Sequence, residues 1–345
     1  MELDNQNSEE ERLVEAVATP EETTLEITLR PQHFEDFIGQ EQIKQNLNIA
    51  IQAAKKRREP LEHILLYGNP GLGKTTLSHI IGREMNANVK VTSGPTLEKV
   101  GDLAAILSNL QEGDILFIDE IHRLNKTIEE VLYPALEDYS LDIIIGKGPA
   151  ARTIRMPLAR FTLIGATTKL SLLSSPLRDR FGHTFHLTFY EPADIEKILR
   201  RNATILSVTL EETATPLIAS RSRRTPRIAN RLLKRIRDVA ELENDGLINE
   251  SVAKRALALL NIDEHGLDEV DRQLLTILIQ KFSGGPTGLN TLAASVAEEM
   301  DTIETVYEPF LLQLGFIERT PRGRMATPAA YLHLGFDVPK KQSLF

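Results

Sequence analysis

A glycine-rich segment at residues 68–75, Gly-Asn-Pro-Gly-Leu-Gly-Lys-Thr, has the spacing G-x-x-x-x-G-K-[ST] of a phosphate-binding loop. An apolar run at 64–67 precedes it and a helical pattern at 76–85 follows, so the segment joins an expected strand to an expected helix. Glycines in such a loop let backbone N–H groups turn toward an anion, and the amino end of the helix adds partial positive charge. The segment therefore predicts a site for the phosphates of a nucleotide.

The last residues of this loop predict how the phosphates are held. Lys74 is placed to reach the β- and γ-phosphates, and the Thr75 hydroxyl is placed to ligate Mg²⁺. We therefore expect ATP and Mg²⁺ as cofactors. The loop residues expected to bind them are Gly71, Gly73, Lys74, Thr75 and Thr76.

A pair of carboxylates, Asp119 and Glu120, follows a second apolar run at 115–118. Ligands gather at the carboxyl ends of parallel strands, so both carboxylates are expected near the phosphate loop. Asp119 is expected to hold the Mg²⁺ shell, directly or through water, and Glu120 to deprotonate a water for in-line attack on the γ-phosphate. Thr167 or Thr168, which close a later strand pattern, could bond that water or the γ-phosphate, although both could instead be structural.

The elements that must position these residues divide the chain into three parts. Apolar runs typical of strands covered on both faces recur in the first part, at 64–67, 89–91, 115–118, 161–164 and 184–187. Helical patterns alone fill 192–261. Three short helices, at 268–281, 289–299 and 302–313, then precede a two-strand ribbon at 315–319 and 324–327. We expect an α/β domain with a mostly parallel sheet, a small all-helical domain and a C-terminal winged helix.

The charge of the chain is unevenly distributed. Its 345 residues include 40 Lys and Arg against 49 Asp and Glu, a net charge of −9. Nine acidic residues and one basic residue, Arg12, lie between Glu2 and Glu26, so this stretch is expected to be a disordered acidic tail. The remainder is nearly neutral, and the overall acidity does not exclude a nucleic-acid partner.

Composition excludes several other classes of protein. The chain has no cysteine, which excludes disulfides, thiolate zinc sites and a cysteine nucleophile. It has no run of 18 apolar residues and no apolar signal segment, so we expect a cytoplasmic protein without a membrane partner. The spacing of the eight histidines indicates no metal site, and these side chains are expected to be structural.

With these residues in place, the chain resembles the AAA+ ATPases and, more narrowly, the RuvB family of Holliday junction branch migration motors. The resemblance extends over about residues 29–339. Its most specific segments are Thr-Ser-Gly-Pro at 92–95, Gly-Asp-Leu-Ala-Ala at 101–105, Asp-Glu-Ile-His-Arg-Leu at 119–124, Gly-Pro-Ala-Ala-Arg at 148–152, Gly-Ala-Thr-Thr at 165–168, Thr-Pro-Arg-Ile-Ala-Asn at 225–230 and Arg-Thr-Pro-Arg-Gly-Arg at 319–324. It implies a DNA-dependent ATP hydrolase that acts in recombination and DNA repair.

The resemblance implies more nucleotide contacts than the loop supplies. Leu29 and Arg30 resemble the segment that closes over the adenine, with Tyr190 on the opposite side, although Tyr190 could also be a packing aromatic between domains. Another stretch resembles part of the site's lining, and it consists of Glu137, Asp138 and Tyr139.

Three further residues resemble groups that respond to the γ-phosphate. Thr168 resembles the polar sensor. Arg180 resembles the arginine finger that reaches the nucleotide of the adjacent subunit, which implies a homohexameric ring. Arg227 resembles a second sensor in the helical lid, so domain closure on ATP would move it. Arg227 lies in a basic stretch, 221–237, that could otherwise be a solvated helix face.

Two regions are expected to contact partners. The apolar hairpin at 141–154 could be an ordinary sheet edge, but the resemblance implies that it docks RuvA, the junction-binding protein, with RuvC joining the resolving complex. The helix at 302–313 carries no Lys or Arg, so we expect double-stranded DNA to contact the ribbon instead. The ribbon could also be a solvated basic hairpin, and its expected DNA-binding residues are Arg319, Arg322 and Arg324.

The expected domains are an acidic tail at 1–26, an ATPase domain at 27–190, a lid at 191–262, a winged helix at 263–338 and a tail at 339–345. Three alternative functions are weaker. A clamp loader or replication initiator would not need the basic ribbon fused to a lid. A protein unfoldase normally has an aromatic translocation loop, and residues 94–101 contain no aromatic. A non-catalytic regulator would not need the complete set of phosphate-site residues.

Overall fold

The computed structural model describes residues 27–145 and 152–339. These form two compact units: one lies within Arg30–Tyr190, and the other comprises residues 191–339 together with residues 27–29. The expected acidic tail at 1–26 and residues 340–345 of the expected C-terminal tail lie outside the described residues.

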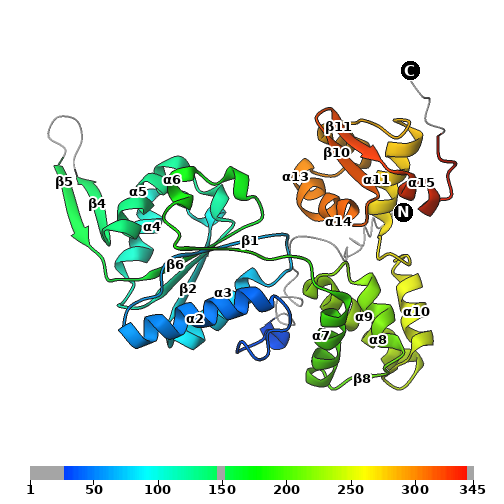
Figure 1. The fold of residues 1–345 in the computed structure, drawn as a ribbon, viewed down its shortest axis with the longest axis horizontal. Helices are drawn as coiled ribbons and strands as arrows, with labels where there is room; N and C mark the ends of the chain where they lie inside the picture. Colours follow the sequence, from blue (N-terminus) through cyan, green and yellow to red (C-terminus); the bar gives the residue numbers. More distant parts are fainter. Residues whose placement is uncertain (1–26, 146–151, 340–345) are drawn as a thin grey trace, which may run out of the picture. The chain divides into compact units, whose positions relative to one another are not determined.

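A five-stranded parallel sheet forms the centre of the first unit (Figure 1). In spatial order its strands are β2 (Val89–Ser93), β3 (Ile115–Asp119), β6 (Thr162–Thr167), β1 (Ile64–Tyr67) and β7 (His183–His186). All five expected strands are confirmed. The central strands β3 and β6 are covered on both faces, which is why their sequences are apolar without alternation.

Helices cover both faces of this sheet (Figure 1). Helices α2 (Glu41–Arg57) and α3 (Lys74–Met85) lie on one face, and α4 (Val100–Ser108), α5 (Lys126–Glu137) and α6 (Ser175–Arg178) lie on the other. The side chain of Asn125 caps α5 by accepting a hydrogen bond from the backbone N–H of Ile128 at 2.9 Å. Ile128 and Leu132, spaced four residues apart, turn the apolar side of α5 toward the core.

An antiparallel hairpin extends from this unit (Figure 1). It consists of β4 (Ser140–Ile145) and β5 (Arg152–Pro157), in register from the Ser140–Pro157 pair to the Ile145–Arg152 pair. The expected hairpin at 141–154 is therefore present in its two strands, and residues 146–151 lie outside the described residues.

The second unit begins with the lid. Its helices are α7 (Pro192–Ile205), α8 (Ala214–Arg221), α9 (Pro226–Glu243) and α10 (Glu250–Leu259). The helical expectation holds apart from a two-residue parallel ladder between β8 (Thr209–Leu210) and β9 (Leu247–Ile248). The helix α9 begins at Pro226, whose fixed φ suits the first helical position.

The rest of the second unit has the three helices and ribbon of a winged helix. Its helices are α11 (Glu269–Gln280), α12 (Leu289–Val296), and α13 (Met300–Thr302) continued through a π-helical turn into α14 (Glu308–Gln313). The ribbon pairs β10 (Ile317–Thr320) with β11 (Gly323–Ala326). A further helix, α15 (Pro328–His333), was not expected, although Thr327-Pro328 is a helix-start signal.

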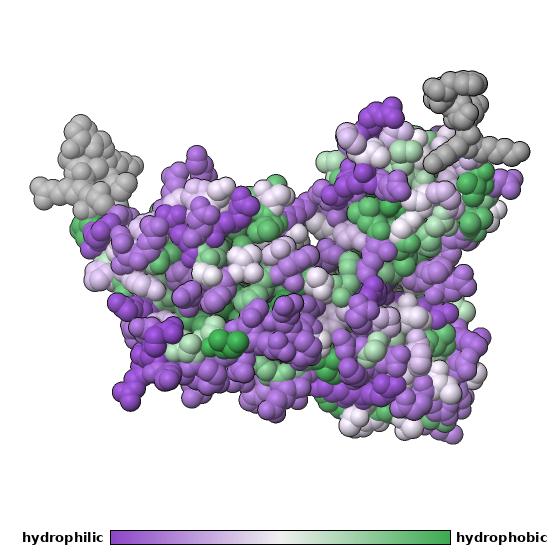
Figure 2. Space-filling model, viewed as in Figure 1, coloured by the Kyte–Doolittle hydropathy of each residue, from purple (hydrophilic) through white to green (hydrophobic). Residues whose placement is uncertain are grey.

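Hydrophilic residues cover most of each unit on the face drawn in Figure 2, with smaller hydrophobic patches between them. Within residues 27–145 and 152–339, no helix has the length and apolar character needed to cross a membrane.

Candidate nucleotide-binding site

The phosphate loop lies where β1 ends and α3 begins, so α3 points its amino end at the loop. Gly68 and Gly73 have φ angles of 144° and 100°, which L side chains rarely adopt. A Cβ at Gly68 would lie 2.3 Å from the backbone oxygen of Leu187, and one at Gly73 would lie 3.2 Å from the Phe37 ring. Gly68 is therefore required by space as well as by conformation, whereas Gly73 is required chiefly by its backbone conformation.

Lys74 is the first residue of α3, and it is almost fully buried. Its Nζ donates hydrogen bonds to the backbone oxygens of Gly68 at 2.7 Å and Asn69 at 2.8 Å. These bonds hold the ammonium group against the start of the loop. Thr75 and Thr76 follow in the first turn of the helix, where the Thr75 hydroxyl offers the hard oxygen ligand that Mg²⁺ prefers.

The two expected carboxylates lie at the same edge of the sheet as the loop, because β1 and β3 both run parallel to β6. Asp119 ends β3, and its Oδ1 accepts a hydrogen bond from the backbone N–H of Glu120 at 2.9 Å. Glu120 has a φ of 50°, and its Oε2 lies 3.9 Å from both His122 Nε2 and Arg123 Nη1. The bend at Glu120 directs the chain away from the strand directly after the carboxylates.

The structure separates the two candidate threonines. Thr167 is fully buried, and its hydroxyl bonds His122 Nδ1 at 2.9 Å and accepts from the Lys169 N–H at 3.0 Å. This hydroxyl is committed to the protein interior. Thr168 is partly exposed at the end of β6, so it is the better candidate for contact with a nucleotide or water. His122 has the structural role expected for it.

Arg180 lies at the opposite edge of the sheet from the phosphate loop. It precedes β7 by three residues, and β7 begins beside Ile64, the first residue of β1. Its Nη2 forms an ion pair with Glu137 Oε1 at 3.0 Å, and its guanidinium lies 4.4 Å from the centre of the Tyr133 ring. The four residues of β1 span about 13 Å, so Arg180 is not beside this chain's own loop.

The stretch at 137–139 also lies at this amino edge, away from the chain's own phosphate loop, so its contact with a nucleotide stays a prediction. Tyr139 packs against Phe161, which precedes β6, with ring centres 6.0 Å apart. Burial raises the pKa of the Tyr139 hydroxyl, with a smaller opposing effect from Arg160. Asp138 lies 3.8 Å from Arg155 of the hairpin. The stretch is brought together with Arg180, through Glu137, and not with Lys74.

Tyr190 and Arg30 lie beside the loop and its helix. The Tyr190 hydroxyl donates to the backbone oxygen of Leu72 at 3.2 Å, and the residue is buried. Tyr190 therefore packs against the phosphate loop, and its place beside the adenine stays a prediction. Burial lowers the pKa of His79 on α3, and the nearby positive charges of Arg30 and Arg83 lower it further. Arg30 is therefore close to the helix that follows the loop.

Leu29 and Arg227 belong to the other compact unit, so their approach to the nucleotide stays a prediction. The backbone oxygen of Leu29 accepts a hydrogen bond from Arg201 Nη1 at 3.0 Å, which joins this segment to α7 of the lid. Arg227 lies in the first turn of α9, directly after Pro226.

The ribbon arginines have a partner that the sequence reasoning missed. Glu308 is buried, and its carboxylate accepts hydrogen bonds from Arg319 Nε at 2.7 Å and from Arg324 Nη2 at 2.9 Å. Burial by itself would raise the pKa of Glu308, but the bonds from the two arginines outweigh it and the pKa is lowered. Arg322 lies exposed in the turn. Opposite charge was the one sequence signal, and it did not specify which residues pair.

Comparisons with known proteins agree with this arrangement. Family models match residues 29–187 as the Holliday junction DNA helicase RuvB P-loop domain, 190–263 as the RuvB AAA lid domain and 264–335 as the RuvB C-terminal winged helix domain. The Holliday junction branch migration complex subunit RuvB of Dehalococcoides mccartyi is 58% identical over 328 residues, which cover 95% of this chain and 94% of that protein.

Solved structures agree as well. The Thermotoga maritima RuvB Holliday junction branch migration motor is 51% identical, with a TM-score of 0.84 over 90% of this chain and 100% of that one. A lysine-to-arginine variant of the same protein gives a TM-score of 0.85 at 51% identity, over 90% of this chain and 99% of that one. With the phosphate loop, the carboxylate pair and all three domains accounted for, the chain belongs to the RuvB family of P-loop AAA+ ATPases.

Proposed function

We propose that the chain is an ATP-driven motor that forms a hexameric ring on duplex DNA and drives branch migration of Holliday junctions in recombination and repair. The observation that carries the proposal is the meeting of Lys74, Asp119 and Glu120 at one edge of the sheet, in a chain whose three domains all match one family. The working parts are an ATPase domain at 27–190, a lid at 191–262 and a winged helix at 263–338.

The residues at the carboxyl edge fit ATP and Mg²⁺. The glycines of the loop leave space for phosphate oxygens, and the amino end of α3 points at that space. Thr75 and Asp119 supply oxygen ligands for Mg²⁺. A bound Mg²⁺ ion neutralises part of the phosphate charge. Glu120 takes a proton from the water whose oxygen bonds to the γ-phosphorus, while the bond from that phosphorus to the ADP oxygen breaks. Thr168 orients this water.

Arg180 completes the site of a neighbouring subunit. It lies at the amino edge of its own sheet together with Glu137, so the nucleotide it reaches is one bound to another copy of the chain. Its positive charge meets charge that develops on the γ-phosphate in the transition state. Leu29, Arg30 and Tyr190 enclose the adenine, and Arg227 moves with the lid when ATP binds.

The winged helix holds DNA without reading its sequence. Arg319 and Arg324 are fixed by the same carboxylate, and Arg322 lies between them in the turn. Arginines on a rigid ribbon suit phosphate contacts, which carry no sequence information and suit a motor that must move along any duplex. The hairpin at 141–154 docks RuvA, and RuvC joins the complex that resolves the junction.

Branch migration of a synthetic four-way junction tests the proposal, measured with ATP and Mg²⁺ in the presence and absence of RuvA. We expect ATP-dependent strand exchange that RuvA stimulates. The Glu120→Gln variant should bind ATP and fail to turn it over, whereas Glu130→Gln, an exposed change on α5, should behave as wild type. Wild-type turnover in Glu120→Gln would contradict the general-base role, and loading of a sliding clamp without junction movement would contradict the motor role.

A further inference from the structure

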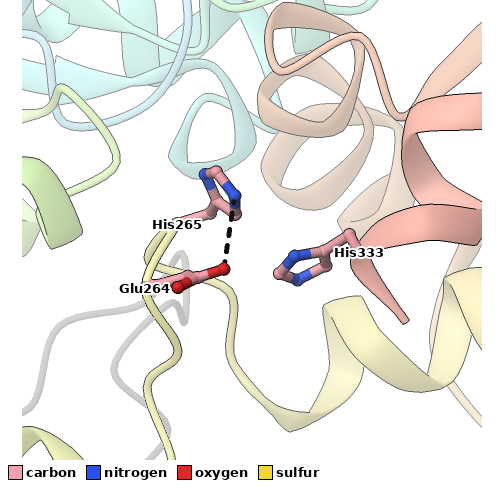
Figure 3. A group of neighbouring side chains, drawn as sticks. All are labelled: Glu264, His265 and His333. Carbon is pink, nitrogen blue, oxygen red and sulfur yellow. Dashed lines mark ion pairs between the residues drawn. The ribbon is translucent and has the colours of Figure 1, made fainter. Parts of the chain in front are cut away.

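Two histidines far apart in the sequence meet in the second unit. His265 lies in the segment that joins α10 to α11, and His333 is the last residue of α15. Their ring centres are 4.8 Å apart at an interplanar angle of 71°. Figure 3 shows both rings and the Glu264 carboxylate around one space. One potential ligand atom from each of the three residues lies within 4.8 Å of the other two.

The segment that carries Glu264 and His265 is held in place by Asp263. Asp263 Oδ1 accepts hydrogen bonds from the backbone N–H groups of His265 at 2.9 Å and Leu267 at 2.8 Å. Its other oxygen, Oδ2, lies 2.8 Å from His333 Nε2. One carboxylate therefore fixes the turn and the second imidazole together. Phe316 packs against both imidazoles: it is stacked on the His333 ring at 4.9 Å between ring centres and lies edge-on to the His265 ring at 5.5 Å.

We propose that Glu264, His265 and His333 bind one divalent transition-metal ion of the zinc class, with Asp263 orienting the His333 ring. A neutral His333 that donates from Nε2 to Asp263 keeps a lone pair on Nδ1 for the metal. Carboxylate–histidine–metal arrangements of this kind fix the tautomer and the direction of the ligand. A water molecule would complete four-coordination.

The ring geometry suits such an ion. With Zn–N distances of about 2.0–2.1 Å and tetrahedral angles, two ligating imidazoles have ring centres about 5 Å apart, close to the observed separation. Tetrahedral ligand atoms lie about 3.4 Å from one another, so ligand atoms that are up to 4.8 Å apart must move closer by as much as about 1.4 Å. Glu264 and His265 have side chains 73% and 45% exposed, and rotation of these two can supply the contraction.

The donor set distinguishes this site from the nucleotide's metal site. Two imidazoles and one carboxylate favour zinc, cobalt, nickel or copper, whereas Mg²⁺ prefers oxygen ligands. A bound ion would fasten the end of α15 to the segment between lid and winged helix, and so stiffen that joint. The inference stands apart from branch migration, because it depends only on this unit's own side chains.

Zinc binding to the full-length, nucleotide-free chain tests the proposal by calorimetry in saturating Mg²⁺, with cobalt(II) absorption as a second readout. We expect one zinc site that Mg²⁺ does not displace, and a rise of about 5 °C in unfolding temperature at saturating zinc. Glu264→Gln and His265→Ala should weaken binding about tenfold or more, and Asp263→Asn about 10–100-fold. His333→Ala should also weaken zinc binding. If the His333→Ala protein misfolds, Glu264→Gln and His265→Ala still test the proposal, because both of these side chains are exposed.

Two controls identify the ion's location. His33→Ala removes an imidazole that is 60% exposed beside Glu84 in the other unit, and it should not change the affinity. Asp119→Asn removes the carboxylate expected to hold Mg²⁺, and zinc binding should persist. Equal zinc affinity in wild type and His265→Ala would overturn the proposal, as would binding lost in Asp119→Asn. Binding that follows total histidine content would show adventitious zinc only, and would also overturn it.

Discussion

Glu308 and Arg324 form a two-pronged ion pair: Arg324 Nη2 donates to Oε2 at 2.9 Å and Nε donates to Oε1 at 3.0 Å. Arg319 shares the same Oε1 from the neighbouring strand at 2.7 Å. Arg319 and Arg324 are also direct partners across the ribbon. The third helix has no Lys or Arg, but its Glu308 fixes the direction of both ribbon arginines.

Replacing Glu308 with Gln should loosen the ribbon and weaken DNA binding. The variant keeps the shape but leaves two arginines without their carboxylate, which should cost about 1–3 kcal/mol of winged-helix stability. Protection of β10 and β11 amides from hydrogen exchange measures this loss, and fluorescence anisotropy with duplex DNA measures affinity. Glu318→Gln, an exposed change on β10, is the matched control. Equal protection in both variants would refute the positioning role.

The same carboxylate predicts an acid-sensitive winged helix. The pKa of Glu308 is lowered in the fold, so the native state binds fewer protons than the unfolded chain below the ordinary glutamate value of 4.5. The stabilisation is present above pH 4.5 and is lost as the pH falls through the folded pKa. Hydrogen exchange of the ribbon at pH 7 and pH 4 should show the loss in wild type. A Glu308→Gln chain should lack this part of the pH dependence.

The sequence predicted what local patterns determine. Glycine spacing, an apolar strand and a helix start are contiguous, so the phosphate loop could be recognised before its geometry was known. The carboxylate pair could be placed because parallel strands share an edge. Pairings over long separations could not be predicted. Neither the bond between Glu308 and Arg324 nor the meeting of His265 with His333 leaves a trace in spacing, since tertiary packing alone brings these residues together.

The position of Arg180 shows a second limit. Family resemblance implied its role and the ring, but the edge of the sheet on which it lies follows from β7 beginning beside the start of β1. Glu137 and Tyr139 lie at the same edge. Their residue types alone did not specify where in the lining of a nucleotide site they belong. Which subunit a residue serves is a property of the fold and the assembly.

Arg180→Ala should reduce ATP turnover about 10³–10⁵-fold while each subunit still binds ATP. Arg180→Ala subunits and Glu120→Gln subunits should each inhibit the rings that they form with wild-type subunits. Each variant removes one side of a nucleotide site that two neighbouring subunits share. Steady-state hydrolysis across mixing ratios measures both effects. Arg178→Ala is the control, since Arg178 lies two residues away and bonds Ser175 of its own helix. Additive, independent activities in the mixtures would exclude a finger acting on another subunit.

Substitutions of Thr167 and Thr168 should have different effects, one on stability and the other on catalysis. Thr167→Val deprives the buried His122 ring of a hydrogen-bond partner, so it should destabilise the ATPase domain by about 1–3 kcal/mol. Thr168→Val should instead lower turnover with little loss of stability. Urea unfolding and steady-state ATP hydrolysis of both variants test this division. The reverse pattern would assign the sensor role to Thr167.

A buried ion pair between the lid and the winged helix gives the last prediction. Arg223, two residues after α8, donates to Asp271 of α11 at 2.5 Å, and its guanidinium lies 4.5 Å from the centre of the Phe310 ring. Burial raises the pKa of Asp271 to about 7, against the attraction of Arg223, so this carboxylate depends on its partner to stay ionised. Arg223→Met keeps the apolar packing but removes the cation that pairs with Asp271 and leaves that buried carboxylate with the backbone N–H of Asp268, which should cost about 3–5 kcal/mol.

Adding Asp271→Asn to Arg223→Met should recover part of that loss, because a neutral amide then replaces the buried carboxylate that has lost its cation. Arg224→Met is the control: Arg224 pairs with Glu191, whose side chain is 72% exposed, so it should cost less than about 1 kcal/mol. Urea unfolding of wild type, of the single variants Arg223→Met and Asp271→Asn, and of the double variant gives the coupling energy of the pair. Since Arg223 lies four residues before Arg227, a loosened pair should also reduce strand exchange per ATP hydrolysed. Full coupling of hydrolysis to junction movement in Arg223→Met would mean that lid motion reaches the DNA by another route.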